Sequence, residues 1–147
     1  MKKSLKLSGV QIEITSTCNF KCNFCPVSGQ GDIFPMPSRK HIEERKFYEI
    51  IDKIEGFDLN YLTFNFIGEP MAHPKVFDYI TYVNSKDLPF MLVTNGTLTK
   101  KHTFNKMNES GLKLLKISLQ VADKESFPES RGTKMSYDLY LKKIIDV

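Results

Sequence analysis

The chain has 147 residues, of which 41% are hydrophobic and 26% are charged, and its formal net charge is +4. These values are typical of one soluble globular domain, and the spread of basic residues without a dense cluster disfavours nucleic acid as a partner. No apolar run approaches the roughly 18 residues of a membrane span, and no signal-peptide core follows the basic N-terminus, so we expect a cytoplasmic protein without a membrane partner.

The first half of the chain alternates between strand-like and helix-like segments. Residues 10–15 place apolar side chains at every second position, which predicts a strand. A loop rich in Gly and Pro follows at residues 26–38. Residues 42–54 carry an apolar stripe that predicts a helix, with Gly56 as its stop, and the aromatic-rich residues 61–67 predict a second strand.

The second half continues this alternation. We expect, in order, a helix with Pro74 in its first turn, a strand over 89–94, a helix from Thr99 to Gly111, a strand over 112–119 and a helix from Ser136 to the C-terminus. Four successive strand–helix units predict an α/β fold with a parallel sheet, because parallel strands need such crossover connections. Helices should cover its outer face, and a ligand should bind beyond the carboxyl ends of the strands.

Three cysteines, Cys18, Cys22 and Cys25, follow the first predicted strand within eight positions. An odd number of cysteines in a reducing compartment argues against disulfides and for metal binding or catalysis. Three thiolates this close can bind one small inorganic core. A four-iron cluster takes four ligands, so three cysteines leave one iron open to bind and activate another molecule.

Three other interpretations of the cysteines compete with an open iron–sulfur cluster. A structural zinc site takes a fourth ligand, and none of the histidines pairs with the motif in sequence: His41, His73 and His102. A ferredoxin cluster takes a fourth cysteine, which the chain lacks. Chance clustering of core cysteines does not explain a loop in which polar and charged residues separate them. These points favour the open cluster.

Polar residues also follow the other three predicted strands. Gly68 and Glu69 come after the second strand, a Thr-Asn-Gly sequence comes after the third at residues 94–96, and Ser118 and Arg131 follow the fourth. Gly68 leaves room for a ligand close to the backbone. Glu69 offers a carboxylate to a cationic amine, and a hydroxyl with a guanidinium suits a carboxylate. Each group alone is more often structural, but their joint occurrence at one sheet edge indicates a shared site.

These motifs together resemble those of the radical SAM superfamily, in which SAM is S-adenosylmethionine. The cysteines have the family's Cys-x-x-x-Cys-x-x-Cys spacing, and Phe24 stands just before the third of them. Residues 68–70 are similar to the family's Gly-Gly-Glu-Pro motif, with Ile67 in place of the first glycine. Residues 94–96 and 117–120 resemble the family's third and fourth strand ends, so the resemblance covers nearly the whole chain.

The resemblance implies a role for each of these residues. The three cysteines would hold a [4Fe–4S] cluster whose open iron chelates the methionine moiety of SAM. Gly68 and Glu69 would contact the SAM amine, and Phe24 would lie beside the adenine. Ser118 and Arg131 resemble the pair that contacts the SAM carboxylate or ribose in family members with an enzyme-maturation C-terminal extension.

The resemblance also implies an oxidoreductase-type reaction. One electron from a flavodoxin or ferredoxin would cleave SAM to methionine and a 5′-deoxyadenosyl radical. This radical would take a hydrogen atom from a substrate, either a small molecule or a peptide. The alternative is a non-catalytic iron–sulfur-binding fragment or degenerate paralogue, which would bind a cluster without turning over SAM.

The number of strand–helix units departs from the family pattern. The family core is a partial TIM-like barrel of six units, and this chain supplies about four. We therefore expect residues 1–147 to form one radical SAM core domain that is truncated on its C-terminal side. The long loop at residues 26–38 resembles that of the subgroup with a cysteine-rich C-terminal extension, while a simple wrap over the cluster would explain it equally well. The outer edge of strand 112–119 should be unpaired, and the last helix should leave its apolar residues uncovered: Tyr140, Leu141, Ile144 and Ile145. We therefore expect the chain to self-associate or to expose apolar surface.

Overall fold

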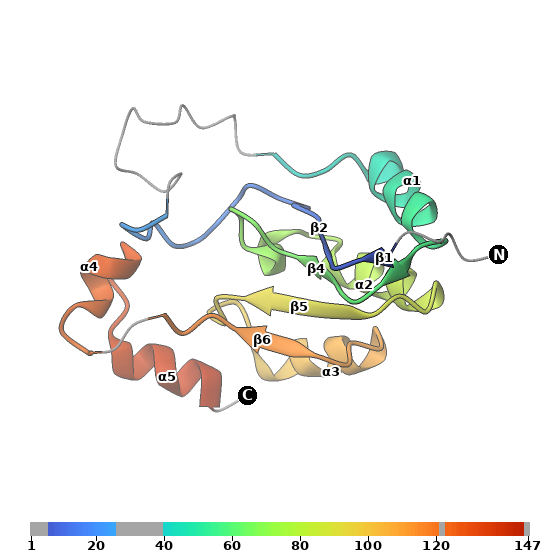
Figure 1. Ribbon diagram of the computed structural model, residues 1–147. Helices are drawn as coiled ribbons and strands as arrows, with labels where there is room; N and C mark the ends of the chain where they lie inside the picture. Colours follow the sequence, from blue (N-terminus) through green and yellow to red (C-terminus); the bar gives the residue numbers. More distant parts are fainter. Residues whose placement is uncertain (1–5, 26–39, 121–122, 146–147) are drawn as a thin grey trace.

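The computed structural model describes residues 6–25, 40–120 and 123–145, and it has the α/β architecture expected from the sequence (Figure 1). Four parallel strands form the main sheet in the order β2-β4-β5-β6. These strands are β2 at Val10–Gln11, β4 at Leu62–Phe64, β5 at Phe90–Thr94 and β6 at Leu115–Ile117. Because the strands are parallel, all four carboxyl ends meet at one edge of the sheet.

The strands differ from the sequence prediction in length and number. β2, β4 and β6 are shorter than the predicted ranges 10–15, 61–67 and 112–119. A second sheet of two short parallel strands was not predicted, with β1 at Lys6–Leu7 and β3 at Asp58–Leu59. Strands of two residues are too short to show an alternation of apolar and polar side chains, so the sequence carries no signal for them.

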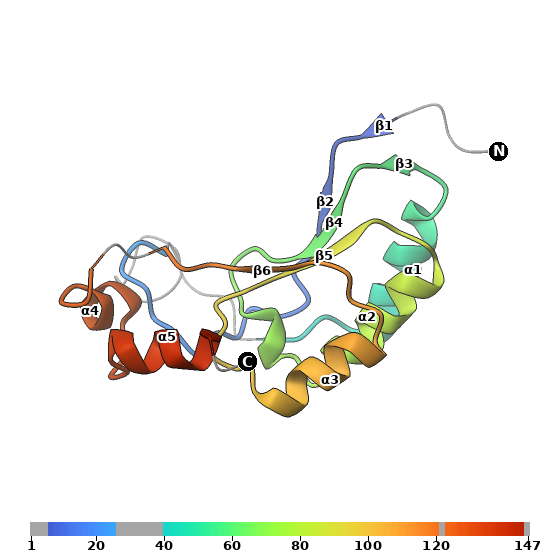
Figure 2. The ribbon, with the colours of Figure 1, turned by 90° about the horizontal axis from the view of Figure 1, so that it is seen from below.

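Three helices cover one face of the main sheet (Figure 2), namely α1 at Glu44–Ile54, α2 at Val76–Ser85 and α3 at Lys101–Glu109. The last predicted helix is α5 at Tyr137–Ile145, near the carboxyl end of β6. Two short segments were not predicted, the 3-10 helix η1 at Pro70–Ala72 and the helix α4 at Phe127–Arg131. In the described part of the chain, no helix is long and apolar enough to cross a membrane.

The main core lies between the sheet and its helices. Phe47 and Ile51 of α1 are fully buried. Phe47 stacks on Tyr79 of α2 with ring centroids 3.8 Å apart, and its ring also meets Phe64 of β4 edge-on at 5.6 Å. Burying one such large apolar side chain contributes roughly 1.5–3 kcal/mol. This packing fixes the strand ends on which the site is built.

Most helix boundaries follow the predicted caps and stops. Pro74 does not lie in the first turn of α2 as predicted, because α2 begins at Val76 and Pro74 belongs to the preceding turn. Ser136 caps α5 by accepting a hydrogen bond from the Leu139 N–H at 3.3 Å, and Gly111 follows α3 with a φ of +77°. Thr99 was predicted to cap α3, and this prediction is wrong. Its hydroxyl donates to the Gly96 carbonyl instead, and the helix begins two residues later. The Thr99 hydroxyl is therefore bonded within the turn after β5 and does not cap the helix.

A second core joins α4 and α5 to the loop at residues 18–25, here called the cysteine loop. Phe127 of α4 and Tyr140 of α5 stack with ring centroids 4.8 Å apart. Phe20 packs against both rings at 6.2 and 6.1 Å, and all three side chains are buried. The cysteine loop therefore has an apolar anchor of its own, separate from the main core.

Backbone hydrogen bonds attach α4 directly to the cysteine loop. The Lys21 N–H donates to the Arg131 carbonyl, and the Asn23 N–H donates to the Ser130 carbonyl, both at 3.0 Å. Gly132 follows α4 in the left-handed conformation with a φ of +55°. A β-carbon at this position would lie 2.1 Å from the Lys21 carbonyl oxygen, so only glycine fits the contact.

β6 forms one edge of the main sheet, as predicted for the fourth unit. Within the described ranges it pairs with β5 alone. α5 buries Tyr140 and packs Ile144 against the second core, but Leu139 is 48% exposed and Ile145 is 74% exposed. Ile145 is therefore uncovered as predicted, whereas Tyr140 is fully buried because it packs in the second core. Self-association of the chain stays a prediction.

Substituting Gly132 by alanine should detach α4 from the cysteine loop. The new β-carbon would collide with a backbone oxygen, and a non-glycine residue in the left-handed conformation costs roughly 1–2 kcal/mol by itself. We expect Gly132→Ala to lower the free energy of unfolding in urea by about 2 kcal/mol or more. The amide protons of Lys21 and Asn23 should also lose protection from hydrogen exchange.

Gly56→Ala is the matched control for this substitution, because nothing lies within 4 Å of the β-carbon position at Gly56. If Gly132→Ala were as stable as Gly56→Ala, with Lys21 and Asn23 still protected, the tight contact would not be required.

Candidate functional site

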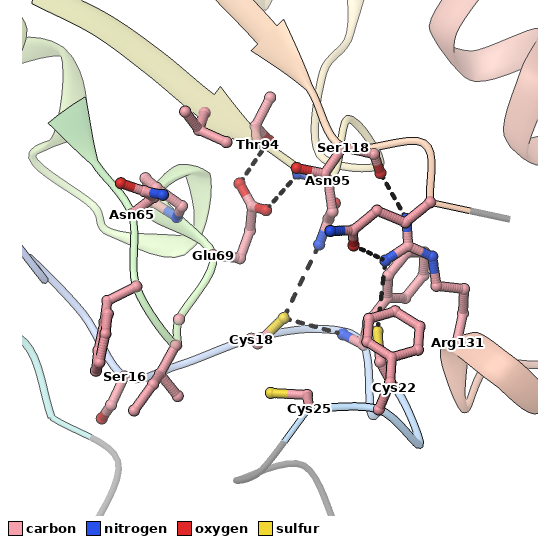
Figure 3. Close-up of a pocket in the computed structure, with 18 residues that line it drawn as sticks. Ser16, Cys18, Cys22, Cys25, Asn65, Glu69, Thr94, Asn95, Ser118 and Arg131 are labelled. Atoms are coloured by element: carbon pink, nitrogen blue, oxygen red, sulfur yellow. Dashed lines mark hydrogen bonds between the residues drawn. The ribbon is translucent and has the colours of Figure 1, made fainter. Parts of the chain in front are cut away.

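A pocket of about 320 Å³ opens at the carboxyl edge of the main sheet (Figure 3). This volume is typical of small-molecule sites. Its walls come from the cysteine loop and from the segments that follow β4, β5 and β6, which is where a ligand was expected. All eight residues singled out from the sequence line it: Cys18, Cys22, Phe24, Cys25, Gly68, Glu69, Ser118 and Arg131.

The three cysteines lie together on the cysteine loop, grouped at one end of the pocket (Figure 3). Cys22 is buried, while Cys18 and Cys25 are half-buried. Local hydrogen bonds shape the loop, since the Phe20 N–H donates to Cys18 Sγ at 3.4 Å and the Cys25 N–H donates to the Cys22 carbonyl at 3.1 Å. Burial raises the pKa of the Cys18 thiol, so metal binding there would release a proton.

The donor set fits an iron–sulfur cluster better than a single metal ion. Within the described ranges, no three His, Cys, Asp or Glu side chains are close enough to hold one ion. A four-iron cluster takes one cysteine at each iron, so its ligands do not need to meet at one point. His41 and His73 pack against each other with ring centroids 4.7 Å apart. Neither lines the pocket, which disfavours the zinc alternative.

Glu69 places a buried carboxylate in the pocket wall. It is 3% exposed. Its Oε1 accepts hydrogen bonds from the Thr94 hydroxyl at 2.6 Å and the Met71 N–H at 3.0 Å, and its Oε2 accepts one from the Asn95 N–H at 2.7 Å. Burial raises the pKa of Glu69, and these hydrogen bonds oppose the rise. The donors fix the carboxylate in one orientation, in which a cationic group of a ligand could contact it.

Gly68 is required by a close approach of the chain to itself. A β-carbon at Gly68 would lie 1.8 Å from the Thr15 carbonyl oxygen. The Gly68 N–H donates to Glu13 Oε1 at 3.3 Å, and the Glu69 N–H donates to the Thr17 carbonyl at 2.8 Å. The sequence indicated room for a ligand here, whereas the space beside the Gly68 α-carbon holds the backbone that leads into the cysteine loop.

Asn95 connects three parts of the site, a role that its predicted place at the end of the third strand did not reveal. Its Nδ2 donates to Asn19 Oδ1 at 3.0 Å and lies 3.9 Å from Cys18 Sγ. Its carbonyl accepts a hydrogen bond from the Tyr140 hydroxyl at 2.7 Å. Because its N–H also donates to Glu69, Asn95 joins the cysteine loop, the buried carboxylate and α5. Its place directly after a buried strand was the available signal.

Arg131 lies between the end of β6 and the cysteine loop, with only 2% of its surface exposed. Its Nη2 donates to the carbonyls of Ser118 and Leu119 at 2.5 and 3.0 Å, and its Nη1 donates to Gln120 Oε1 at 3.3 Å. Nη1 also lies 3.6 Å from Cys22 Sγ, within hydrogen-bond reach of sulfur. This one side chain therefore attaches the fourth strand to the cysteine loop.

Phe24 and Ser118 complete the predicted set. The Phe24 side chain is half exposed at the pocket, with its ring centroid 5.5 Å from the Arg131 guanidinium. The Ser118 N–H donates to the Thr94 carbonyl at 2.8 Å, which extends the pairing of β5 and β6 to the pocket edge. Both residues line the pocket, and their contacts with a ligand stay predictions.

Comparison with known proteins bears directly on the family. The model of the radical SAM superfamily matches residues 12–146. A tungsten-containing aldehyde ferredoxin oxidoreductase cofactor-modifying protein of Pyrococcus furiosus is 30% identical over 118 residues, covering 75% of this chain and 30% of that protein. An AdoMet-dependent heme synthase of Methanosarcina barkeri is 27% identical over 132 residues, covering 90% of this chain and 36% of that protein.

Solved structures share the fold. The chain superposes on Streptococcus suis SuiB bound to precursor peptide SuiA with a TM-score of 0.67 and 21% identity, covering 95% of this chain and 30% of that one. For BtrN in complex with AdoMet and 2-DOIA the TM-score is 0.66 at 17% identity, with coverages of 97% and 56%. The chain spans 30% and 36% of the lengths of the two curated relatives named above. Because the family model matches nearly the whole chain, this protein belongs to the radical SAM superfamily.

Proposed function

We propose that this chain binds a [4Fe–4S] cluster through Cys18, Cys22 and Cys25, binds SAM in the adjoining pocket, and generates a 5′-deoxyadenosyl radical. The observation that supports this most strongly is the arrangement of the pocket. Three cysteines of one loop line it together with a buried carboxylate, Glu69, whose orientation is fixed by three donors. When bound, the cluster supplies the electron that cleaves SAM reductively.

The chain's own residues would bind and orient SAM. Glu69 would accept hydrogen bonds from the SAM ammonium group, because a carboxylate held by neutral donors keeps its negative charge for a cation. Asn95 would fix the position of Glu69 relative to the cysteine loop, because it donates hydrogen bonds to both. Phe24 would lie beside the adenine, and Ser118 and Arg131 would face the carboxylate or ribose, as the resemblance implies.

The partners follow from this chemistry. A flavodoxin or ferredoxin would deliver the electron in the cytoplasm, where a reducing environment keeps the cysteines available for iron. The substrate class is a small molecule or a peptide. The relatives include a heme synthase and, with 27% identity over 143 residues, a GTP 3′,8-cyclase of Staphylococcus carnosus. SuiB was crystallised with its precursor peptide.

The chain would supply the N-terminal four units of a radical SAM core. Its short share of each curated relative's length supports this division. The main alternative is a non-catalytic iron–sulfur-binding fragment or degenerate paralogue. It would share the cysteine loop and differ in having no SAM cleavage.

Replacing Cys22 with alanine should abolish cluster binding, because it removes one of three iron ligands. After anaerobic reconstitution with iron and sulfide, the wild type should retain iron and a brown absorbance, and Cys22→Ala should retain little of either. Asn23→Ala is the matched control, since Asn23 is exposed on the same loop and its N–H bond to Ser130 does not need the side chain. Full iron content in Cys22→Ala would remove Cys22 from the proposed ligands.

Formation of 5′-deoxyadenosine separates the enzyme from the non-catalytic alternative. The reconstituted protein is reduced, SAM is added, and the product is measured by chromatography. Because the chain supplies about four of six units, we expect it to cleave SAM poorly, and any product above the level of Cys22→Ala would indicate a radical SAM enzyme. A stable cluster without any product would favour the alternative.

Replacing Glu69 with glutamine should weaken SAM binding and leave the cluster in place. A hydrogen bond to a charged group contributes roughly 1.5–3 kcal/mol, so we expect the Kd for SAM to rise about tenfold or more. Glu49→Gln, on the exposed face of α1, is the control for loss of one carboxylate. Unchanged SAM affinity in Glu69→Gln would remove Glu69 from the site.

The pH dependence of SAM binding should also depend on Glu69. Because burial raises its pKa, the carboxyl group takes up a proton at a higher pH than an exposed glutamate does. Protonation removes the charge that attracts the SAM amine, so affinity should fall as pH falls through this raised pKa. Isothermal titration at several pH values should show this fall in the wild type and not in Glu69→Gln.

A further inference from the structure

Arg131 carries a positive charge in a buried position without a carboxylate partner. Among the residues that the structure describes, no salt bridge includes it. Its oxygen acceptors, on Ser118, Leu119 and Gln120, are all neutral. Its buried Nε has no hydrogen-bond partner in this part of the chain. A buried charge without a counter-charge is costly, which points to negative charge on a group bound nearby.

The guanidinium also contacts a cysteine sulfur. Nη1 lies 3.6 Å from Sγ of Cys22, which is 8% exposed. The rings of Phe20 and Phe24 have centroids 5.4 and 5.5 Å from the guanidinium carbon. Because Arg131 and Cys22 are both buried, the attraction between the guanidinium and a thiolate at Cys22 is screened less than it would be at the surface.

We infer that Arg131 donates a charge-assisted hydrogen bond to the Cys22 sulfur and thereby raises the reduction potential of the iron–sulfur cluster. Reduction adds one negative charge to the cluster. A nearby cation that donates an N–H to a ligand sulfur stabilises the reduced form more than the oxidised form. This inference rests on the proposed function, because it requires a cluster at Cys22.

This role differs from the contact with SAM that the family resemblance implies. Arg131 is here a positioning residue that acts through Cys22, and it acts whether or not SAM is bound. Its effect therefore has a readout that does not depend on turnover, namely the midpoint potential of the cluster in protein without SAM.

The reduction potential, followed by electron paramagnetic resonance in an anaerobic redox titration, tests this role. Arg131→Gln removes the charge and Arg131→Lys keeps it. Arg45→Gln removes the same charge from α1, where the side chain is 80% exposed. We expect Arg131→Gln to lower the reduced-to-oxidised ratio about tenfold at a fixed solution potential, which is a shift of about 59 mV for a one-electron couple. The midpoint potential of Arg131→Lys should lie between those of the wild type and Arg131→Gln. The potential of Arg45→Gln should equal that of the wild type.

Failure of the proposed function and failure of this inference give different results. A wild-type protein that takes up no cluster would contradict the proposed function. A cluster that forms normally and has the same potential in the wild type and in Arg131→Gln would overturn the role of Arg131. An equal shift in Arg45→Gln would also overturn it, because net charge alone would then explain the change.

A second measurement on the wild type covers the case in which Arg131→Gln does not fold, as circular dichroism would show. The protein is produced with isotope-labelled arginine guanidinium nitrogens, and the reduced cluster is studied by electron spin echo envelope modulation. A weak coupling to a labelled nitrogen is expected in the wild type and should be lost in Arg131→Lys. Absence of this coupling in the wild type would overturn the hydrogen bond.

Discussion

The cysteine loop forms no helix or strand, so hydrogen bonds from distant parts of the chain hold it in place. The Glu69 N–H bonds the Thr17 carbonyl just before the loop, the end of β5 bonds the Asn19 side chain, and α4 accepts from Lys21 and Asn23. Fixing the backbone of each residue costs roughly 1–2 kcal/mol. Ordering the cysteines therefore depends on these hydrogen bonds together with the packing of Phe20 and the contact of Arg131 with Cys22, and the shape of the pocket follows from where these contacts meet.

The pocket presents two buried charges of opposite sign that do not neutralise each other. Glu69 sits in the wall formed by β4 and β5, and Arg131 sits between β6 and the cysteine loop (Figure 3). Each is held by neutral hydrogen-bonding groups of the chain. A ligand that carries an ammonium and a carboxylate on one carbon, as the methionine end of SAM does, would be complementary in charge to Glu69 and Arg131.

The sequence predicted those parts of the molecule that repeat a pattern over enough residues. The four main strands, three covering helices and α5 came from apolar periodicity, apolar or aromatic runs, and cap or stop residues, and the site residues came from their place at strand ends. α4 was missed because it has only five residues and contains Pro128, so it shows neither a full apolar stripe nor ordinary helix composition. The links made by Asn95 and Arg131 were also missed, because they depend on which strand ends become neighbours in space.

Gly68 and Thr99 also show that a local sequence pattern does not determine which group a residue contacts in the folded chain. Gly68 was noted from its motif, but its actual neighbour is a backbone oxygen of Thr15, which only the folded chain brings there. The hydroxyl of Thr99 was assigned to a helix that begins beyond it. In both cases the local pattern identified a residue that has a structural role, but the tertiary arrangement determines which group that residue contacts.

The second core is a packing unit distinct from the main core. Phe20, Phe127 and Tyr140 pack apart from the main core, and they include one residue of the cysteine loop itself. Proteins open locally in such contiguous units at a lower free energy than global unfolding requires. A group that bound the cysteines would stabilise the packed form of this unit, because Cys22 belongs to the same core. Binding at the cysteines and packing of α4 and α5 against the cysteine loop would therefore stabilise each other.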